Sequence, residues 1–172
     1  MRILVLAEHD DGHLKTPKLN TITAAAMIGG EIDVLVAGHD VRCVVDAASR
    51  LDGIAKVLVA DAPHFAGNLA ENVAAQLVVL TDTDVYSHIL FAATSAGKNV
   101  APRVAARLDS AQLSDVIEFV SGDTYCRPIY AGNAIATVRS RDAINIITIR
   151  TTAFEPCDTI PNSRQMERRS KF

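Results

Sequence analysis

The sequence predicts an α/β fold of three layers, in which a mainly parallel sheet lies between two layers of helices. Hydrophobic residues make up 49% of the 172 residues, enough for a substantial core, and few of them are aromatic. Runs rich in Val and Ile alternate with runs rich in Ala, as in proteins whose buried parallel strands alternate with helices. Four such strand–helix units precede residue 109, a rhythm that favours right-handed parallel crossovers.

The spacing of apolar residues divides this first part of the chain into elements. Strands are predicted at the continuous apolar runs, which are residues 2–7, 31–37, 54–60 and 88–93. Helices are predicted where apolar residues recur at helical spacing, in residues 17–27, 40–51, 69–80 and 99–108. Pro17 suits a first helical turn, Gly29 ends that helix, and Asp40 and Asn68 are expected to cap the next two. The polar residues 8–16 are predicted to form a loop.

The pattern changes after residue 109. Four strand-like runs follow with turn signals but no helix between them, in residues 115–121, 124–129, 134–140 and 144–151. We expect one more parallel strand and then short antiparallel strands that extend one edge of the sheet. The α/β domain is therefore placed at residues 1–152. Residues 153–172, which lose the pattern and end in a basic stretch at 161–172, are predicted to be a linker or disordered tail.

Composition and charge argue against several classes of function. The net charge of −3 argues against nucleic acid as a partner. No apolar run approaches the roughly 20 residues that cross a bilayer, so we expect no membrane insertion. Cys43, Cys126 and Cys157 are too scattered for a disulfide framework or a zinc site. Because the first strand starts directly after Met1, we expect a bacterial cytoplasmic protein, or a mitochondrial matrix protein if a presequence is missing.

The unit from residue 88 to residue 115 carries the first candidate site. Its small polar turn, residues 94–98, follows a predicted strand at the carboxyl end, where open α/β sheets usually bind ligands. A phosphate-binding loop requires G-x-x-x-x-G-K-[ST], but Ala92 replaces the first glycine and Asn99 replaces the hydroxyl that would hold a metal. Two alternatives stay open: the turn is structural or an interface, or the helix that follows attracts an anion. The weak candidates for an anion site are Ser95, Gly97 and Lys98.

No catalytic residue or metal ligand is predicted. Ser95 does not fit the G-x-S-x-G pattern of a nucleophile elbow, because residue 93 is Ala, and no histidine or acid is placed to activate it. His9 and His13 are four residues apart, as metal ligands on a helix are, but Gly12 and neighbouring acids indicate a loop.

A second candidate lies in residues 127–133, which read RPIYAGN. Arginine, tyrosine and asparagine within one turn are costly to bury and adaptable in an interface. Arg127, Tyr130 and Asn133 are therefore candidates for a subunit or domain interface. The alternative is an ordinary surface loop.

Several stretches of the sequence carry a family resemblance. They are residues 92–109 (AATSAGKNVAPRVAARLD), 114–116 (SDV), 127–136 (RPIYAGNAIA) and 148–154 (TIRTTAF). In these stretches, and in length and order over residues 2 to about 155, the sequence closely resembles the amino-terminal domain of the electron transfer flavoprotein alpha subunit.

The resemblance implies a fold like that of the adenine nucleotide alpha-hydrolase group, which is Rossmann-like. It implies an electron carrier rather than an enzyme, built as a heterodimer with a beta subunit. The complete heterodimer would take electrons on FAD from acyl-CoA-type dehydrogenases and pass them to a membrane quinone oxidoreductase. In the family, this alpha domain has lost nucleotide binding and AMP lies in the beta subunit, which agrees with the two departures from a phosphate loop.

The sequence departs from the family after Phe154. Family members continue into a Rossmann-like domain that makes most of the FAD contacts, and its glycine-rich segments have no counterpart in residues 155–172. We therefore expect the FAD-binding domain to be absent, no FAD-site residue in this span, and a scaffold domain that is redox-silent alone. A stand-alone adenine-nucleotide-binding domain is the alternative. The unmatched tail at residues 163–172 also leaves open a decayed gene product with no function.

Overall fold

A computed structural model describes residues 1–10, 13–83, 85–159 and 169–171. Its central sheet has seven strands, all parallel, in the order β12-β5-β4-β1-β6-β11-β7. Their bounds are β1 Arg2–Leu6, β4 Glu31–Gly38, β5 Lys56–Asp61, β6 His88–Ala92, β7 Gln112–Val116, β11 Asn145–Ile149 and β12 Arg169–Lys171. The first four predicted strands are confirmed, and the sheet is parallel as expected.

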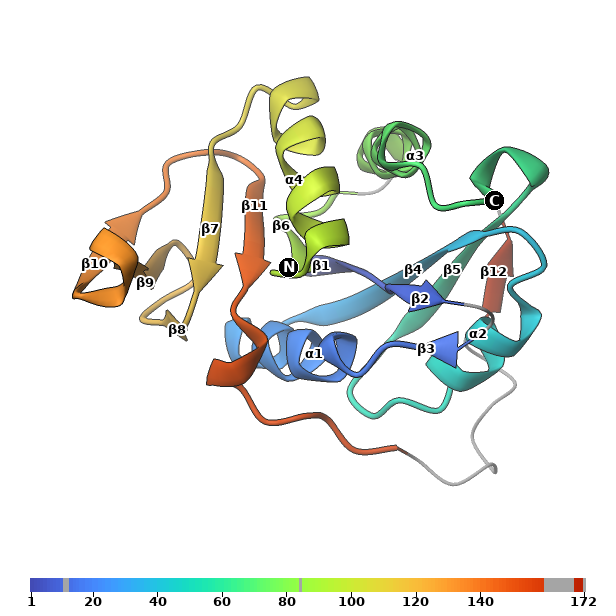
Figure 1. Ribbon diagram of the computed structural model, residues 1–172, viewed down its shortest axis with the longest axis horizontal. Helices are drawn as coiled ribbons and strands as arrows, with labels where there is room; N and C mark the ends of the chain where they lie inside the picture. The colour runs from blue at the N-terminus through green and yellow to red at the C-terminus, as the bar shows by residue number, and fades with distance from the viewer. Residues whose placement is uncertain (11–12, 84, 160–168, 172) are drawn as a thin grey trace.

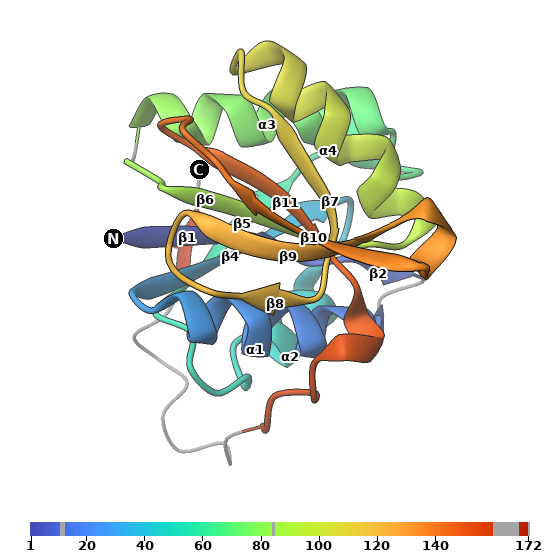
Figure 2. The same ribbon diagram turned by 90° about the vertical axis from the view of Figure 1, so that its left-hand side faces the viewer.

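Helices cover both faces of this sheet, as Figures 1 and 2 show. On one face lie α1 (Pro17–Ile28) and α2 (Arg42–Ala48), and on the other lie α3 (Ala70–Thr83) and α4 (Ser95–Arg107). Successive side chains of β1 enter opposite cores, because side chains alternate along a strand. Ile3 and Val5 pack with α1 and α2, whereas Leu4 and Leu6 pack with α3 and α4. The predicted three-layer arrangement is confirmed.

The later strands are arranged differently from the prediction. β8 (Glu118–Phe119), β9 (Thr124–Ile129) and β10 (Ala134–Arg139) form a separate antiparallel sheet, in the order β10-β9-β8, and do not extend the central one. β11 is parallel and lies between β6 and β7. Burial explains this difference. All five residues of β11 are buried, which suits a strand covered on both faces, whereas β10 alternates half-buried and exposed residues.

Several local expectations were wrong. The predicted loop at 8–16 contains a short hairpin of β2 (His9–Asp10) and β3 (His13–Leu14). Asp40 and Asn68 do not precede their helices directly, since α2 begins at Arg42 and α3 at Ala70. Both residues have positive φ angles, 57° and 52°, which Asp and Asn tolerate in turns but which an N-cap residue does not adopt.

Part of the predicted tail packs on the domain. Phe154 is buried, and its carbonyl oxygen accepts a hydrogen bond of 2.6 Å from Asn20 of α1. The backbone N–H of Cys157 donates to the carbonyl oxygen of Leu19 at 3.2 Å. β12 pairs with β5, whereas residues 160–168 and 172 of the expected linker lie outside the described residues. Among the described helices, none has the length and apolar character needed to span a membrane.

Candidate functional site

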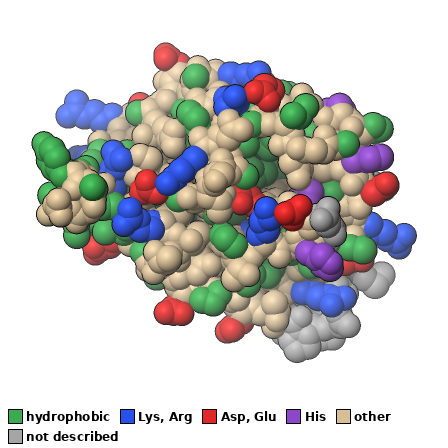
Figure 3. Space-filling view, viewed as in Figure 1, with side chains coloured by type: hydrophobic (Ala, Val, Ile, Leu, Met, Phe, Trp, Pro, Cys, Tyr) green, Lys and Arg blue, Asp and Glu red, His purple; other side chains and the backbone are tan. Residues whose placement is uncertain are grey.

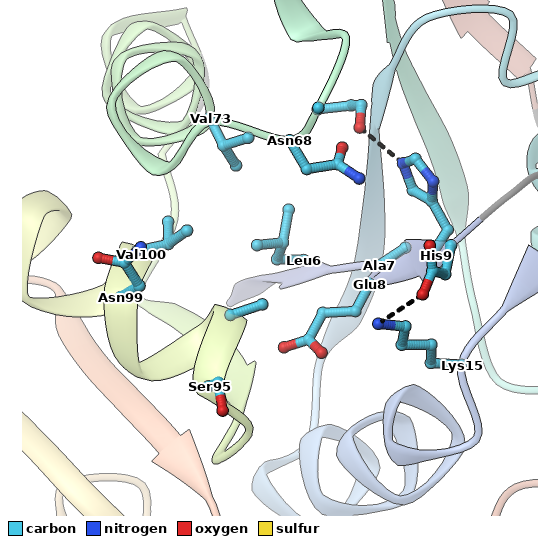
Figure 4. A pocket seen from close by; sticks show the side chains of 14 residues that line it. Leu6, Ala7, Glu8, His9, Lys15, Asn68, Val73, Ser95, Asn99 and Val100 are labelled. Carbon is cyan, nitrogen blue, oxygen red and sulfur yellow. Dashed lines mark hydrogen bonds and ion pairs between the residues drawn. The ribbon is translucent and has the colours of Figure 1, made fainter.

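A pocket of about 370 Å³ opens at the carboxyl end of β1, beside the start of α4. This is the end of the sheet at which parallel α/β proteins usually bind ligands. Figure 4 shows that its side chains come from the end of β1, from the first turn of α4, from α3 and from the short hairpin. The polar side chains in its wall are Glu8, His9, Asp10, Lys15, Asn68, Ser95 and Asn99.

The first turn of α4 forms one wall of the pocket and includes most of the predicted turn. α4 begins at Ser95, four residues before the predicted start, because Thr94 serves as its N-cap. The Thr94 hydroxyl oxygen accepts a hydrogen bond of 3.1 Å from the backbone N–H of Gly97. A Cβ atom on Gly97 would lie 1.9 Å from the carbonyl oxygen of Ala92, so this close approach of helix and strand requires glycine.

Glu8 places a carboxylate at this helix start. The residue follows β1 and Ala7 directly, and only 8% of its surface is exposed. The Thr94 hydroxyl donates to Glu8 Oε1 at 2.5 Å. Burial raises the pKa of the Glu8 carboxyl, against the opposing effects of the Thr94 hydrogen bond, the Lys15 charge and the Gly97 backbone. Sequence analysis missed Glu8, although an acid immediately after a buried strand points toward a ligand-binding edge.

Among the three candidates for an anion site, Lys98 has a side chain that is engaged outside the pocket. Ser95 and Gly97 are both in the first turn of α4, and Ser95 lines the pocket. Lys98 Nζ instead forms an ion pair of 3.1 Å with Asp115 Oδ1 of β7. Lys98 is not among the residues that line the pocket. The cation of a phosphate-loop-like sequence is therefore used to tie α4 to β7.

His9, Asp10 and Lys15, at the short hairpin, also have partners within the domain. His9 Nε2 donates to the carbonyl oxygen of Ala37 at 2.7 Å, which fixes the ring against the end of β4. Lys15 Nζ lies 3.3 Å from Asp10 Oδ2. Within the described ranges no three His, Cys, Asp or Glu side chains gather as metal ligands.

The second candidate site separates into internal and exposed residues. Arg127 donates two hydrogen bonds to Ser114, at 2.8 Å to its carbonyl oxygen and 2.7 Å to its hydroxyl. Arg127 therefore joins β9 to β7. Tyr130 and Asn133 are exposed in the connection between β9 and β10, and 79% of Tyr130 and 64% of the neighbouring Ile135 are accessible to solvent.

Comparison with known protein families gives a match over nearly the whole chain. A family model described as the electron transfer flavoprotein domain matches residues 3–171. The chain belongs to the electron transfer flavoprotein family. The resemblance inferred from the sequence is thereby confirmed, and the family is one of electron-transfer proteins.

The similar relatives within this family are alpha subunits. The electron transfer flavoprotein subunit alpha of Pseudomonas aeruginosa is 54% identical over 155 residues, which cover 90% of this chain and 50% of that protein. The mitochondrial subunit alpha of Dictyostelium discoideum is 42% identical over 169 residues, covering 95% and 48%. The subunit alpha of Paracoccus denitrificans is 44% identical over 155 residues, covering 90% and 50%. The chain spans about half the length of these curated relatives.

Proposed function

We propose that this electron transfer flavoprotein domain is the scaffold part of an alpha subunit and docks a beta subunit. The complete heterodimer would carry electrons on FAD from acyl-CoA-type dehydrogenases to the quinone pool. The observation that supports this proposal most strongly is the 54% identity, over 90% of the chain, to a protein named as such an alpha subunit. The domain itself would be a carrier component rather than an enzyme, acting in a bacterial cytoplasm or a mitochondrial matrix.

The connection between β9 and β10 is the surface we propose for docking. We define the β9–β10 patch as Tyr130, Asn133 and Ile135. An exposed aromatic and an exposed aliphatic side chain, with an amide beside them, have the composition of an interface core. Figure 3 shows hydrophobic side chains at the end of the molecule where the small sheet lies.

The backbone of the patch favours binding without large rearrangement. Tyr130 and Ala131 adopt positive φ angles of 49° and 53° in a tight turn. Arg127 anchors the preceding strand to Ser114. Because the strand that leads into the patch is anchored, a partner would have less free energy of ordering to supply.

Co-expression with a beta-type subunit from the same source tests the docking proposal. Size-exclusion chromatography with light scattering should show a 1:1 complex, and Ile135→Asp and Tyr130→Ala should weaken it at least about tenfold. Val85→Asp is the matched control, because Val85 is also an exposed aliphatic residue but lies between α3 and β6. Absence of any complex, or equal weakening by all three substitutions, would refute the proposal.

We also propose that residues 1–172 hold no FAD by themselves and that the complete heterodimer supplies the flavin site. The buried carboxylate of Glu8 supports this, because it would repel a pyrophosphate group at the start of α4. The purified chain should show no flavin absorbance. Stoichiometric FAD in the purified chain would contradict this part of the proposal.

A stand-alone adenine-nucleotide-binding domain is the second candidate function. The observation that favours it is the 370 Å³ pocket beside the α4 N-terminus. Calorimetric titration with AMP and ATP separates the two functions. Micromolar binding that Ser95→Glu abolishes would favour nucleotide binding, because Ser95 lines the pocket at the start of α4, and absence of heat would favour the scaffold.

A further inference from the structure

We propose that the Glu8 carboxylate is the resident anion of the α4 N-terminus and that it keeps phosphate-bearing ligands out of the pocket. This specificity role deepens the proposal that residues 1–172 hold no FAD by themselves and does not depend on docking of a beta subunit. It concerns a pocket that lies at the usual ligand-binding end of a parallel sheet but has a buried carboxylate in its wall.

The first step of the argument is the position of Glu8. The start of a helix carries N–H groups without intrahelical partners and a partial positive charge, so it attracts an anion. A Cβ atom built on Gly97, in the first turn of α4, would lie 3.1 Å from Glu8 Oε1. The carboxylate of Glu8 therefore lies against the first turn of α4, at the end of the helix that attracts an anion.

The second step is the hydrogen bonding that holds the carboxylate there. Because the Thr94 hydroxyl oxygen accepts from Gly97, its own proton is free to be donated, and it goes to Glu8 Oε1. The N-cap side chain thus links the helix backbone to the acid. This arrangement serves an acceptor-only group, which an ionised carboxylate is.

The third step is the charge of the pocket wall. Its charged side chains are Glu8, Asp10 and Lys15, two acids against one base. Lys15 is paired with Asp10 and Lys98 with Asp115, so neither lysine is positioned to neutralise a second anion at α4. Figure 4 shows the Glu8 carboxylate between the start of α4 and Lys15. A phosphate in this pocket would face a buried like charge.

Substitution of Glu8 tests this proposal directly. Glu8→Gln keeps the size of the side chain and an oxygen for the Thr94 hydroxyl but removes the charge. Asp10→Asn is the matched control, because it removes a charge from the same pocket wall away from α4. Each variant and the unaltered chain would be titrated calorimetrically with AMP, inorganic pyrophosphate and adenosine, which lacks phosphate. Glu8→Ala, with circular dichroism to confirm folding, serves as the second variant.

The expected result is specific to Glu8 and to phosphate. Glu8→Gln should bind AMP and pyrophosphate at least about tenfold more tightly than the unaltered chain, with adenosine affinity unchanged. The backbone amide signals of residues 95–97 should shift in ¹⁵N spectra as pyrophosphate binds. Three outcomes would each overturn the proposal. The first is an equal gain in anion affinity in Asp10→Asn, and the second is AMP binding by the unaltered chain that is as tight as by Glu8→Gln. The third is that Glu8→Gln and Glu8→Ala are both folded but bind no anion.

Discussion

His88 Nε2 lies 3.0 Å from the hydroxyl oxygen of Tyr125, and this contact joins the central sheet to the small antiparallel sheet. Both side chains are also within hydrogen-bond distance of the carbonyl oxygen of Gly122, at 2.8 Å from His88 and 2.7 Å from Tyr125. Since a carbonyl oxygen only accepts, His88 Nε2 carries a proton. Through this network, the β8–β9 turn that precedes the β9–β10 patch is fixed to β6.

Acidification is expected to weaken the His88 junction. Burial lowers the pKa of His88 in the folded protein below its usual 6.5. Between this folded-state pKa and pH 6.5, the unfolded chain therefore binds more protons than the folded one. The contribution of His88 to stability is therefore complete above pH 6.5 and falls as the pH drops from 6.5 toward the folded-state pKa. Urea unfolding of the protein and of His88→Gln at pH 7.5 and 5.5 measures this.

At pH 7.5 the free energy of unfolding of the His88→Gln protein should be lower by about 1 kcal/mol, because hydrogen bonds to the small sheet are lost. Between pH 7.5 and pH 5.5, its free energy of unfolding should then fall by less than that of the unaltered protein. An identical pH dependence in the two proteins would exclude His88 as the titrating group.

Gly97→Ala should destabilise the domain by about 3 kcal/mol or more. The added methyl group would lie 1.9 Å from the Ala92 carbonyl oxygen, and that overlap outweighs the roughly 1 kcal/mol by which alanine favours a helix. Gly122→Ala is the control, because a Cβ atom there meets nothing within 4 Å. Its unfolding free energy should change by less than about 1 kcal/mol in denaturant titrations. Equal stability of the two variants would contradict a tight contact at Gly97.

Lys18→Met should stabilise the domain by about 2 kcal/mol at pH 7, because a buried amine without a partner is costly. Lys18 is 1% exposed, and among the described residues its Nζ has no hydrogen-bond partner. Desolvation lowers the pKa of Lys18 from 10.5 to about 7 in the folded protein. Between pH 7 and pH 10.5 the amine is therefore protonated in the unfolded chain but not in the folded one. Stability of the unaltered protein should thus rise from pH 7 to 10.5 relative to Lys18→Met.

Lys15→Met is the control for Lys18, since Lys15 is exposed and its amine forms a surface ion pair with Asp10. Its unfolding free energy should change by less than about 1 kcal/mol, without the rise between pH 7 and 10.5. A destabilised Lys18→Met protein would mean that the amine has a partner that offsets its burial.

Glu8→Gln should raise the free energy of unfolding at pH 7 by about 1 kcal/mol. Burial raises the pKa of Glu8, so the folded state disfavours its ionised form. This penalty is absent below the ordinary carboxyl pKa of 4.5 and develops as the pH rises through the folded-state value. Comparing thermal unfolding of the two proteins at pH 4 and pH 7 checks the sign. A variant less stable at pH 7 would show that the Thr94 hydrogen bond outweighs burial.

The fold was predictable because its central strands are continuous apolar runs. The start of α4 was not, because residues 95–98 contain no large apolar side chain to give a helical pattern. The position of β11 between β6 and β7 depends on pairing between segments far apart in sequence. Such pairing leaves no local signal.

Only part of the candidate site was predictable. Of the three residues that the G-K pattern suggested, Ser95 and Gly97 lie in the first turn of α4, whereas the side chain of Lys98 pairs with Asp115 of β7. A single acid such as Glu8 forms no motif, and its importance arises only when the end of β1 meets Thr94 across 86 residues.

The strand order has a consequence for synthesis on the ribosome. Within the described residues β7 pairs with the central sheet through β11, so residues 112–116 emerge well before the strand that will hold them. Until Ile149 has been made, one side of β6 is a bare edge that can pair with foreign strands. The nascent protein must therefore protect an unfinished sheet through the translation of the entire small antiparallel sheet.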